Sequence, residues 1–220
     1  MDMTKAAMNL FTFFRSGTAH RVRIALGLKG LSATHSYVDL RVDEQLEPPY
    51  AEVNPQKLLP ALVVDGKVMI QSPAILEWLE ETHPTPPLLP SDPMQRAHVR
   101  ALAAIVGCDI HPVNNRRILQ YLRQQFGASE EAVQTWCGRW IGDGFDAYEA
   151  MLRADRGRGA FSFGNAPTLA DLYLIPQVES ARRFNVDMSR WPLISAVDAA
   201  CLALPAFADA APLNQPDAPH

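Results

Sequence analysis

Cysteine is scarce in this chain, with three residues in 220. The three are widely spaced, their number is odd and no CxxC motif occurs, which argues against a disulfide framework and against a structural zinc site. Cys108 and Cys137 are flanked by apolar residues, so we expect both to be small core residues rather than nucleophiles. Together with Cys201, they predict a reduced protein without a bound metal.

Long apolar runs and an excess of one charge are lacking too. Runs such as Ala101–Val106 are far too short to span a bilayer, and the opening residues contain no apolar segment typical of a secretion signal. The net charge of −4 gives no reason to expect nucleic acid or an anionic membrane as a partner. We therefore expect a cytoplasmic protein that binds neither.

The chain before Pro84 alternates short β-like runs with helical ones. Its β-α-β start implies two parallel strands. Asp65-Gly66, between two β-branched runs, indicates a tight hairpin, and Ser72-Pro73 opens the next helix with Ser72 as its N-cap. This order of elements is that of the thioredoxin fold. The expected elements are strands at 10–14 and 36–40, helices at 18–29 and 48–53, the hairpin, and a helix from residue 72.

The segment His83–Pro93 contains five prolines in eleven residues. Proline cannot continue a helix, so the segment is typical of a semi-rigid linker between domains. The fold class that follows is an α/β N-terminal thioredoxin-like domain, residues 8–85, and an all-α C-terminal domain, residues 94–212, which supplies the pocket for a second substrate.

The second domain is expected to be almost wholly helical, with a break near His111-Pro112. Thr168 and Asp171 have the spacing of a capping box, and this structural role explains both residues without a catalytic one. The proline-rich tail beyond residue 212 is expected to be loosely held. The expected helices cover 95–126 with that break, 130–152, the segment from Thr168 onward, and 192–202.

Arg15, Ser16, Gly17 and Thr18 lie where the first strand feeds the first helix. Backbone N–H groups at a helix start are unpaired and the helix dipole is positive there, so an anion is favoured. The two hydroxyls can donate to such an anion. The same four residues would also serve as a polar loop without a ligand, and the charge of Arg15 is by itself weak evidence for one.

Two further positions in this domain suit a peptide ligand. Pro60 directly precedes the third strand, and we expect a cis peptide bond there that exposes the backbone N–H and C=O of Leu59 for pairing with an extended peptide; the alternative is a trans proline that starts an edge strand. Ser72 with free helix N–H groups suits an α-carboxylate, and the Gln71 amide suits an amino or carboxylate group. Taken alone, Ser72 is more often only a helix cap, since serine is a preferred residue at that position.

A dense polar block interrupts the apolar pattern of the helical domain. Helix propensity does not explain its two adjacent asparagines. Arg116 and Arg117 lie about 100° apart around a helix, so at most one faces a cleft, and Arg182 and Arg183 pose the same choice. The block comprises Asp109, His111, Asn114, Asn115, Arg116 and Arg117.

These motifs together resemble the zeta class of cytosolic glutathione transferases, which includes the maleylacetoacetate and maleylpyruvate isomerases. The resemblance runs from about Met8 to Pro216. The block DIHPVNNRRIL with SGTAHR is similar to the bacterial maleylpyruvate isomerases of gentisate breakdown more than to the maleylacetoacetate enzymes. The other motifs that carry the resemblance are FFRSGTAHRVRIAL, NPQKLLPAL, QSPAILEWLEE, TLADLYLIPQV, ARRFNVD and the closing QPD.

The chain departs from the zeta pattern Ser-Ser-Cys-Ser-x-Arg-Val-Arg at one place. Ser16 is retained, Gly17 replaces the second serine and Thr18 replaces the cysteine. A mechanism that needs a protein thiol at this turn is excluded, so we expect neither cysteine-based dehydroascorbate reduction nor thiol transfer. Ser16 or Thr18 can still donate to the thiolate of glutathione.

The resemblance implies a cis–trans isomerisation in which the thiolate of glutathione adds to the cis double bond of a maleyl diketo acid, the resulting enolate rotates, and glutathione is expelled. Because the substrate is a dianion, cationic side chains should hold its carboxylates, and the candidates are Arg15, Arg183 and Arg116. A homodimer is also implied. Glutathione itself would be held by Leu59, Pro60, Gln71 and Ser72, with His111, Asn115 and Arg116 from the helical domain.

Other functions fit the same residues. Maleylacetoacetate differs from maleylpyruvate only at its far end, so either can be the substrate. A transferase that consumes glutathione by conjugation or dehalogenation would share the fold. A rival from another class is a non-enzymatic interaction module, because fold alone does not fix activity. Such a module should have lost the residues that contact glutathione.

Overall fold

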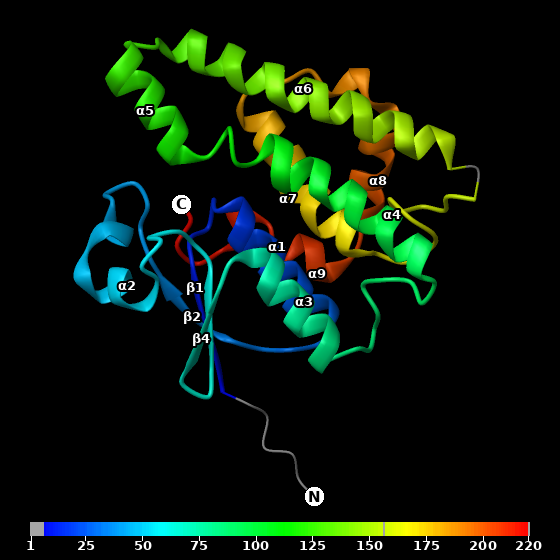
Figure 1. The fold of residues 1–220 in the computed structure, drawn as a ribbon, viewed down its shortest axis with the longest axis horizontal. Helices are drawn as coiled ribbons and strands as arrows, with labels where there is room; N and C mark the ends of the chain where they lie inside the picture. The colour runs from blue at the N-terminus through cyan, green and yellow to red at the C-terminus, as the bar shows by residue number, and fades with distance from the viewer. Residues whose placement is uncertain (1–6, 156, 220) are drawn as a thin grey trace, which may run out of the picture. The chain divides into compact units, whose positions relative to one another are not determined.

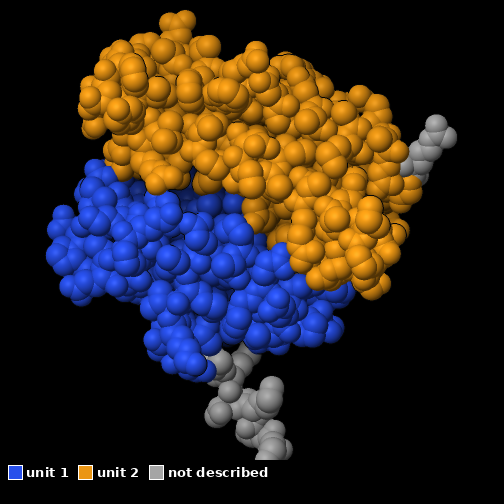
Figure 2. Space-filling model, in the orientation of Figure 1, with its two compact units in different colours: residues 1–87, 204–220 blue, residues 88–203 orange. Residues whose placement is uncertain are grey.

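The computed structural model describes residues 7–155 and 157–219 (Figure 1). They form two compact units, the first up to residue 87 together with residues 204 onward, and the second from residue 88 to 203 (Figure 2). The chain passes from the first unit to the second within the proline-rich segment that was predicted to be a linker. The first unit also takes in residues 204–212, which the predicted limits assigned to the helical domain.

The first unit has the β-α-β and β-β-α order expected of a thioredoxin-like domain. Its sheet has the strand order β2-β1-β3-β4, with β1 parallel to β2 and antiparallel to β3. Figure 1 shows α2 on one side of this sheet and α1 and α3 on the other. The elements are β1 (Met8–Thr12), α1 (Gly17–Leu28), β2 (Thr34–Tyr37), η1 (Glu44–Leu46), α2 (Pro48–Val53), β3 (Ala61–Val64), β4 (Lys67–Ile70), α3 (Ser72–Thr82), α9 (Pro205–Ala208) and η4 (Pro212–Asn214).

The hairpin between β3 and β4 turns at Asp65-Gly66, as predicted. Both residues have positive φ, 48° for Asp65 and 78° for Gly66, and this conformation matches the twist of a tight hairpin. The turn sets the register in which Leu62 faces Met69. The predicted first strand ended at Phe14, whereas β1 ends at Thr12, because the Phe13 and Phe14 carbonyls accept from the Arg23 side chain instead of a neighbouring strand.

The C-terminal tail packs into the first unit, and the expectation that it is loosely held is wrong. Ala218 is buried in the same hydrophobic cluster as Phe14. The Asp217 carboxylate accepts from the Phe14 N–H at 2.8 Å, and the Gln215 amide donates to two carbonyls of the tail at 2.7 and 3.1 Å. Composition did not reveal this packing because the partners lie some 200 residues away in the sequence.

The second unit is helical and breaks where it was predicted to break. α4 (Pro93–Ala104) continues into η2 (Ile105–Ile110), a π-helical stretch, and a turn at His111-Pro112 follows before α5. The remaining elements are α5 (Arg116–Phe126), α6 (Glu130–Ala154), α7 (Leu169–Arg183), η3 (Met188–Arg190) and α8 (Pro192–Leu202). Within the described residues, no helix is long and apolar enough to cross a membrane.

Two glycines allow η2 to pack closely against its neighbours. A Cβ at Gly144 of α6 would lie 2.3 Å from the Ile110 side chain, and one at Gly107 of η2 would lie 2.7 Å from the Tyr173 ring of α7. Both distances are shorter than any normal contact between these atoms, so each helix pair needs a residue without a side chain at the crossing. These contacts hold η2 between α6 and α7.

Buried carboxylates satisfy the starts of α7 and α8. Asp171 accepts from the Thr168 N–H at 2.7 Å and from the Ser162 N–H at 2.8 Å, so the predicted capping box is confirmed. Glu149 of α6 accepts from the N–H groups of Leu193 and Ile194 at 3.1 and 3.0 Å. Unpaired helix N–H groups are costly when buried, and these carboxylates remove that cost.

Candidate functional site

The turn between β1 and α1 brings its two hydroxyls together. Ser16 caps α1 by accepting from the Ala19 N–H, and its Oγ lies 3.1 Å from Thr18 Oγ1. The Thr18 hydroxyl donates to the Leu59 carbonyl at 2.9 Å. Because a hydroxyl carries a single hydrogen, this bond leaves Ser16 as the donor of the pair. Both hydrogens are thus used within the turn, but Ser16 donates to another hydroxyl and Thr18 to a backbone carbonyl, so Ser16 is the one that could turn its hydrogen to a bound anion while the bond to Leu59 is kept.

The peptide bond between Leu59 and Pro60 is cis, as predicted. Leu59 is buried, and its carbonyl accepts from Thr18 and has a second lone pair. In the described part of the chain, nothing accepts from the Leu59 N–H. A backbone donor and an acceptor are thus presented beside the hydroxyls of the turn, as an extended peptide ligand requires.

Gln71 and Ser72 lie at the start of α3, but not in the arrangement that was predicted. Ser72 is the first helical residue, and Gln71 occupies the N-cap position with a positive φ of 69°. The correction is that Ser72 does not cap α3: its Oγ is buried and accepts from Arg21 Nη1 at 3.4 Å. The Gln71 side chain makes no capping bond and donates instead to Gln56. The helix start therefore keeps N–H groups available for an anion.

Helix α1 contributes buried basic side chains to the first unit, and one of them contacts the start of α3. α1 carries the buried residues His20, Arg21 and Arg23. Burial, reinforced by the two arginines, lowers the pKa of His20 to about 3, so this imidazole is neutral at physiological pH. Arg21 and Gln56 are site residues that the sequence reasoning missed. Two arginines in the apolar pattern of one short helix were the available signal, since a buried charge requires a partner.

In the second unit, the polar block lies in and around the turn that follows η2. Asn115 caps α5 by accepting from the Arg117 N–H at 3.1 Å, which explains why two asparagines stand in this region. Arg116 is half-buried and donates to Gln120 at 3.0 Å, whereas Arg117 is exposed. Of Arg116 and Arg117, Arg116 is the more enclosed cation and therefore the better candidate to face a cleft. His111 directly follows η2 and is half-buried.

The adjacent arginines at the end of α7 also differ in their surroundings. Arg182 forms an ion pair with the buried carboxylate of Asp198. Arg183 lies over the Phe184 ring at 4.7 Å and donates to Ser180. The ion pair with a buried carboxylate makes Arg182 a poor candidate to hold a substrate carboxylate.

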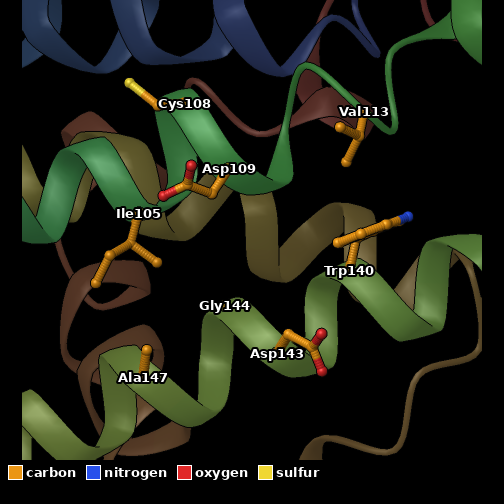
Figure 3. A pocket seen from close by; sticks show the side chains of 8 residues that line it. All are labelled: Ile105, Cys108, Asp109, Val113, Trp140, Asp143, Gly144 and Ala147. Carbon is orange, nitrogen blue, oxygen red and sulfur yellow. The ribbon is translucent and has the colours of Figure 1, made fainter.

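A cavity of about 400 Å³ lies within the second unit, between η2 and α6. Figure 3 shows the carboxylates of Asp109 and Asp143 on its two walls, with Trp140 beside them. Asp143 is paired with Arg139 at 2.9 Å, and no basic side chain of the described residues lines the cavity, so it offers no cation to hold a dicarboxylate. Cys108 also lines it but points away from the other lining side chains (Figure 3).

The cysteines have two kinds of environment. Cys137 is buried, and burial raises the pKa of its thiol to about 11, which agrees with the predicted structural role. Cys201 is buried too, and its pKa is raised for the same reason. Cys108 is exposed, so the expectation that it belongs to the core is wrong. It lies in the π-helical stretch, where the usual helical spacing does not predict which face a residue occupies.

Known proteins resemble this chain over nearly its full length. The family model for the N-terminal domain of glutathione S-transferase matches residues 15–82. Maleylpyruvate isomerase of Ralstonia sp. is 62% identical over 210 residues, which cover 96% of this chain and 99% of the relative. Maleylacetoacetate isomerase of Pseudomonas aeruginosa is 49% identical over 215 residues, with the same coverage.

Solved structures agree with these relatives. The holo structure of a maleylpyruvate isomerase, described as a bacterial glutathione S-transferase of the zeta class, matches with a TM-score of 0.95 and 61% identity, over 96% of this chain and 100% of that one. A maleylacetoacetate isomerase of Methylobacterium extorquens AM1 with bound malonate and GSH matches with a TM-score of 0.93 and 38% identity, over the same shares. The chain therefore belongs to the zeta-class glutathione transferase family of maleylpyruvate and maleylacetoacetate isomerases.

Proposed function

We propose that this protein is a glutathione-dependent cis–trans isomerase that converts maleylpyruvate into fumarylpyruvate in gentisate breakdown. The observation that carries the proposal is the turn at the start of α1, where Ser16 lies beside Thr18, Thr18 donates to the Leu59 carbonyl, and none of residues 15–18 is a cysteine. The 62% identity to the Ralstonia maleylpyruvate isomerase supports the choice of substrate.

The residues of the first unit fit glutathione. Its cysteinyl backbone would pair with the Leu59 N–H and C=O at the cis Pro60, and its γ-glutamyl carboxylate would lie at the start of α3 with Ser72 and Gln71. The Leu59 N–H without an acceptor in the described residues and the α3 start without a side-chain cap are the two observations that support this fit. We assign His111, Asn115 and Arg116 of the second unit to the same ligand.

The protein side of the chemistry consists of donors, cations and a helix terminus. Glutathione, when bound, supplies a thiolate that can add to and leave the double bond. Ser16 and the α1 N-terminus would stabilise the anionic form of that thiol, because a hydroxyl donor and a positive dipole both lower a thiol pKa. Thr18 would hold the Leu59 edge in place through its 2.9 Å bond.

Cationic side chains are proposed to hold the two carboxylates of the substrate. Arg15 is exposed and directly precedes Ser16, and Arg183 and Arg116 belong to the second unit. An arginine matches a carboxylate with two parallel hydrogen bonds, and a cation near the developing enolate stabilises it. Malonate, bound in the Methylobacterium relative, is itself a dicarboxylate, which supports a site of this charge type.

The decisive experiment is a spectrophotometric assay of maleylpyruvate and maleylacetoacetate, each with and without glutathione. We expect turnover of maleylpyruvate that requires glutathione and leaves the free thiol count unchanged. A falling thiol count would indicate a conjugating or dehalogenating transferase instead. Faster turnover of maleylacetoacetate would assign the alternative substrate, and no affinity for glutathione in calorimetry would indicate a non-enzymatic module.

Variants test the roles within that assay. Arg15→Ala and Arg183→Ala should each lower kcat/KM about 100-fold while glutathione affinity changes little, since each removes a carboxylate contact. Arg117→Ala is the matched control, because Arg117 is exposed, and it should stay within about twofold. Ser16→Ala should lower kcat more than Thr18→Ala, whose main effect should be on glutathione affinity; the reverse order would transfer the thiolate contact to Thr18.

We also propose that the protein is a cytoplasmic homodimer, as the zeta-class resemblance implies. Light scattering coupled to gel filtration measures the mass directly. A mass near that of one 24.3 kDa chain would overturn the dimer without affecting the proposed reaction.

A further inference from the structure

The peptide groups on both sides of Phe14 are held by two charged side chains. Its N–H donates to Asp217 Oδ2 at 2.8 Å, and its carbonyl accepts from Arg23 Nη2 at 3.0 Å. Asp217 comes from the C-terminal tail and Arg23 from α1, and Figure 1 shows the tail passing beside the start of α1. Phe14 directly precedes residues 15–18, which we call the reaction turn. These bonds therefore hold the backbone where that turn begins.

Arg23 connects this turn to the residues just ahead of the tail. Its guanidinium donates to Thr12 Oγ1 at 2.9 Å and to the Phe13 carbonyl at 3.3 Å. Two further bonds, of 3.2 and 3.1 Å, reach the Ala210 carbonyl, which lies just ahead of the tail. Burial lowers the pKa of Arg23 to about 10, and the nearby Asp217 acts in the opposite direction, so the side chain stays cationic at neutral pH.

Arg15 and Ser16 both contact the backbone or side chains of residues 13 and 14. The Arg15 guanidinium lies over the Phe14 ring, 5.7 Å from its centre. The Ser16 N–H donates at 3.0 Å to the Phe13 carbonyl, the same oxygen that Arg23 holds. A shift of the 13–14 backbone would therefore displace the hydroxyl and the cation together.

Asp217 has a desolvation cost that packing of the tail does not explain. Its carboxylate accepts from the backbone at the start of the reaction turn rather than from the tail, and its second oxygen is buried without a hydrogen-bond partner in the described residues. Gln215 by contrast bonds only to carbonyls of the tail itself. The hydrogen bond of Asp217 therefore acts on the backbone at Phe14 and not on the tail, and Arg23 holds the next peptide group of the same backbone.

We propose that Asp217 is a positioning residue for the isomerisation, acting with Arg23 through the peptide groups of Phe14 to fix Arg15 and Ser16. The inference rests on the proposed function, because it takes those two side chains as the reacting and substrate-binding groups. A misplacement of about 1 Å at a reacting group can cost about 100-fold in rate, so a residue that never touches the substrate can control turnover.

The test compares Asp217→Ala, Asp217→Asn and Gln215→Ala in the full-length enzyme. Asp217→Ala should lower kcat about 10- to 100-fold and raise the pKa of the bound glutathione thiol, read from its ultraviolet thiolate absorbance across a pH series, because Ser16 moves away. Asp217→Asn keeps an oxygen for the Phe14 N–H and should lose no more than about threefold in kcat. Gln215→Ala loosens only the tail and should keep the parent kcat at a temperature where it is folded.

Three results would overturn the proposal. Equal losses of kcat in Gln215→Ala and Asp217→Ala would mean that tail packing alone matters. An unchanged kcat in folded Asp217→Ala would remove the positioning role. If that variant does not fold, Asp217→Asn decides: a lower thiol pKa with lost turnover would indicate an electrostatic effect of the carboxylate instead. An inactive parent would contradict the proposed function, whereas the thiol titration would still test the position of Ser16.

Discussion

The two units bury charges of opposite sign. Among the described residues, the buried charged side chains of the first unit are Arg21, Arg23 and Lys29, while those of the second unit are Glu149, Asp171 and Asp198. The cations Arg23 and Lys29 donate to backbone carbonyls of loops, whereas the anions Glu149 and Asp171 accept from backbone N–H groups at helix starts.

The difference matters for ligand binding. In the second unit, carboxylates of the protein close the starts of α7 and α8. In the first unit, the start of α3 has no side-chain cap, and its neighbouring buried charge is the cation Arg21. A helix start left open beside positive charge is suited to an external carboxylate. A helix start therefore stabilises the fold in the second unit, and in the first unit it is the place where we propose that a ligand carboxylate binds.

The largest effect is expected from removing a buried carboxylate of the second unit. Asp171→Ala would leave the Ser162 and Thr168 N–H groups buried without an acceptor, and we expect a loss of about 4 kcal/mol in the free energy of unfolding. Denaturant unfolding measures it. Asp92→Ala is the matched control, because Asp92 caps α4 at the surface, and it should cost about 1 kcal/mol. Equal costs would show that burial does not strengthen the cap.

The sequence predicted most of the elements but fewer of the long-range contacts. The cis Pro60, the Asp65-Gly66 hairpin and the capping box at Thr168 are local patterns, and the structure confirms all three. Local signals are readable because each depends on a few adjacent residues. The packed tail was missed because Asp217 reaches a partner far back in the chain, and a proline-rich composition carries no trace of that partner.

Two details of the candidate site were also beyond local reasoning. Ser72 was expected to cap α3, yet the backbone of Gln71 takes that position with a positive φ that is uncommon for a residue with a side chain. Cys108 was expected in the core because its neighbours in the sequence are apolar, but it lies in the π-helical stretch and is exposed. Both departures lie at functional or pocket residues, where local rules are most often broken.

The next largest effect concerns the buried cation Lys29. Its Nζ donates to Glu80 at 2.9 Å and to the carbonyls of His83 and Pro86 at 2.6 and 3.0 Å. Lys29→Met should lower the free energy of unfolding by about 3 kcal/mol, because three acceptors lose a buried donor. Lys67→Met, at the exposed start of β4, is the control and should be neutral. Adding Glu80→Leu to Lys29→Met should recover part of the loss, since the carboxylate that lost its bond to Lys29 is then removed.

A smaller effect follows from the buried, neutral His20. Its pKa falls from 6.5 to about 3 on folding, so the unfolded chain takes up the proton first. The contribution of neutral His20 to the free energy of unfolding is fully present above pH 6.5 and is lost as the pH falls from 6.5 towards 3. The loss is about 2 kcal/mol between pH 7 and pH 5. His20→Asn cannot titrate there and should lack this part of the acid sensitivity. Chemical denaturation of both proteins at pH 7 and pH 5 measures this loss. An equal fall in the free energy of unfolding in the parent and in His20→Asn would contradict the prediction.

The smallest effect separates burial from geometry. Arg123 and Glu130 form a two-pronged ion pair with distances of 2.6 and 2.8 Å, as short as the buried contacts of Asp171. Each partner shifts the pKa of the other in the direction that favours charge, but Glu130 is exposed to solvent. Water screens such a pair and the two side chains lose freedom on pairing. Glu130→Gln should therefore leave Tm unchanged within error, and a Tm loss like that of Asp171→Ala would mean that close geometry, not burial, makes the carboxylates of the second unit stabilising.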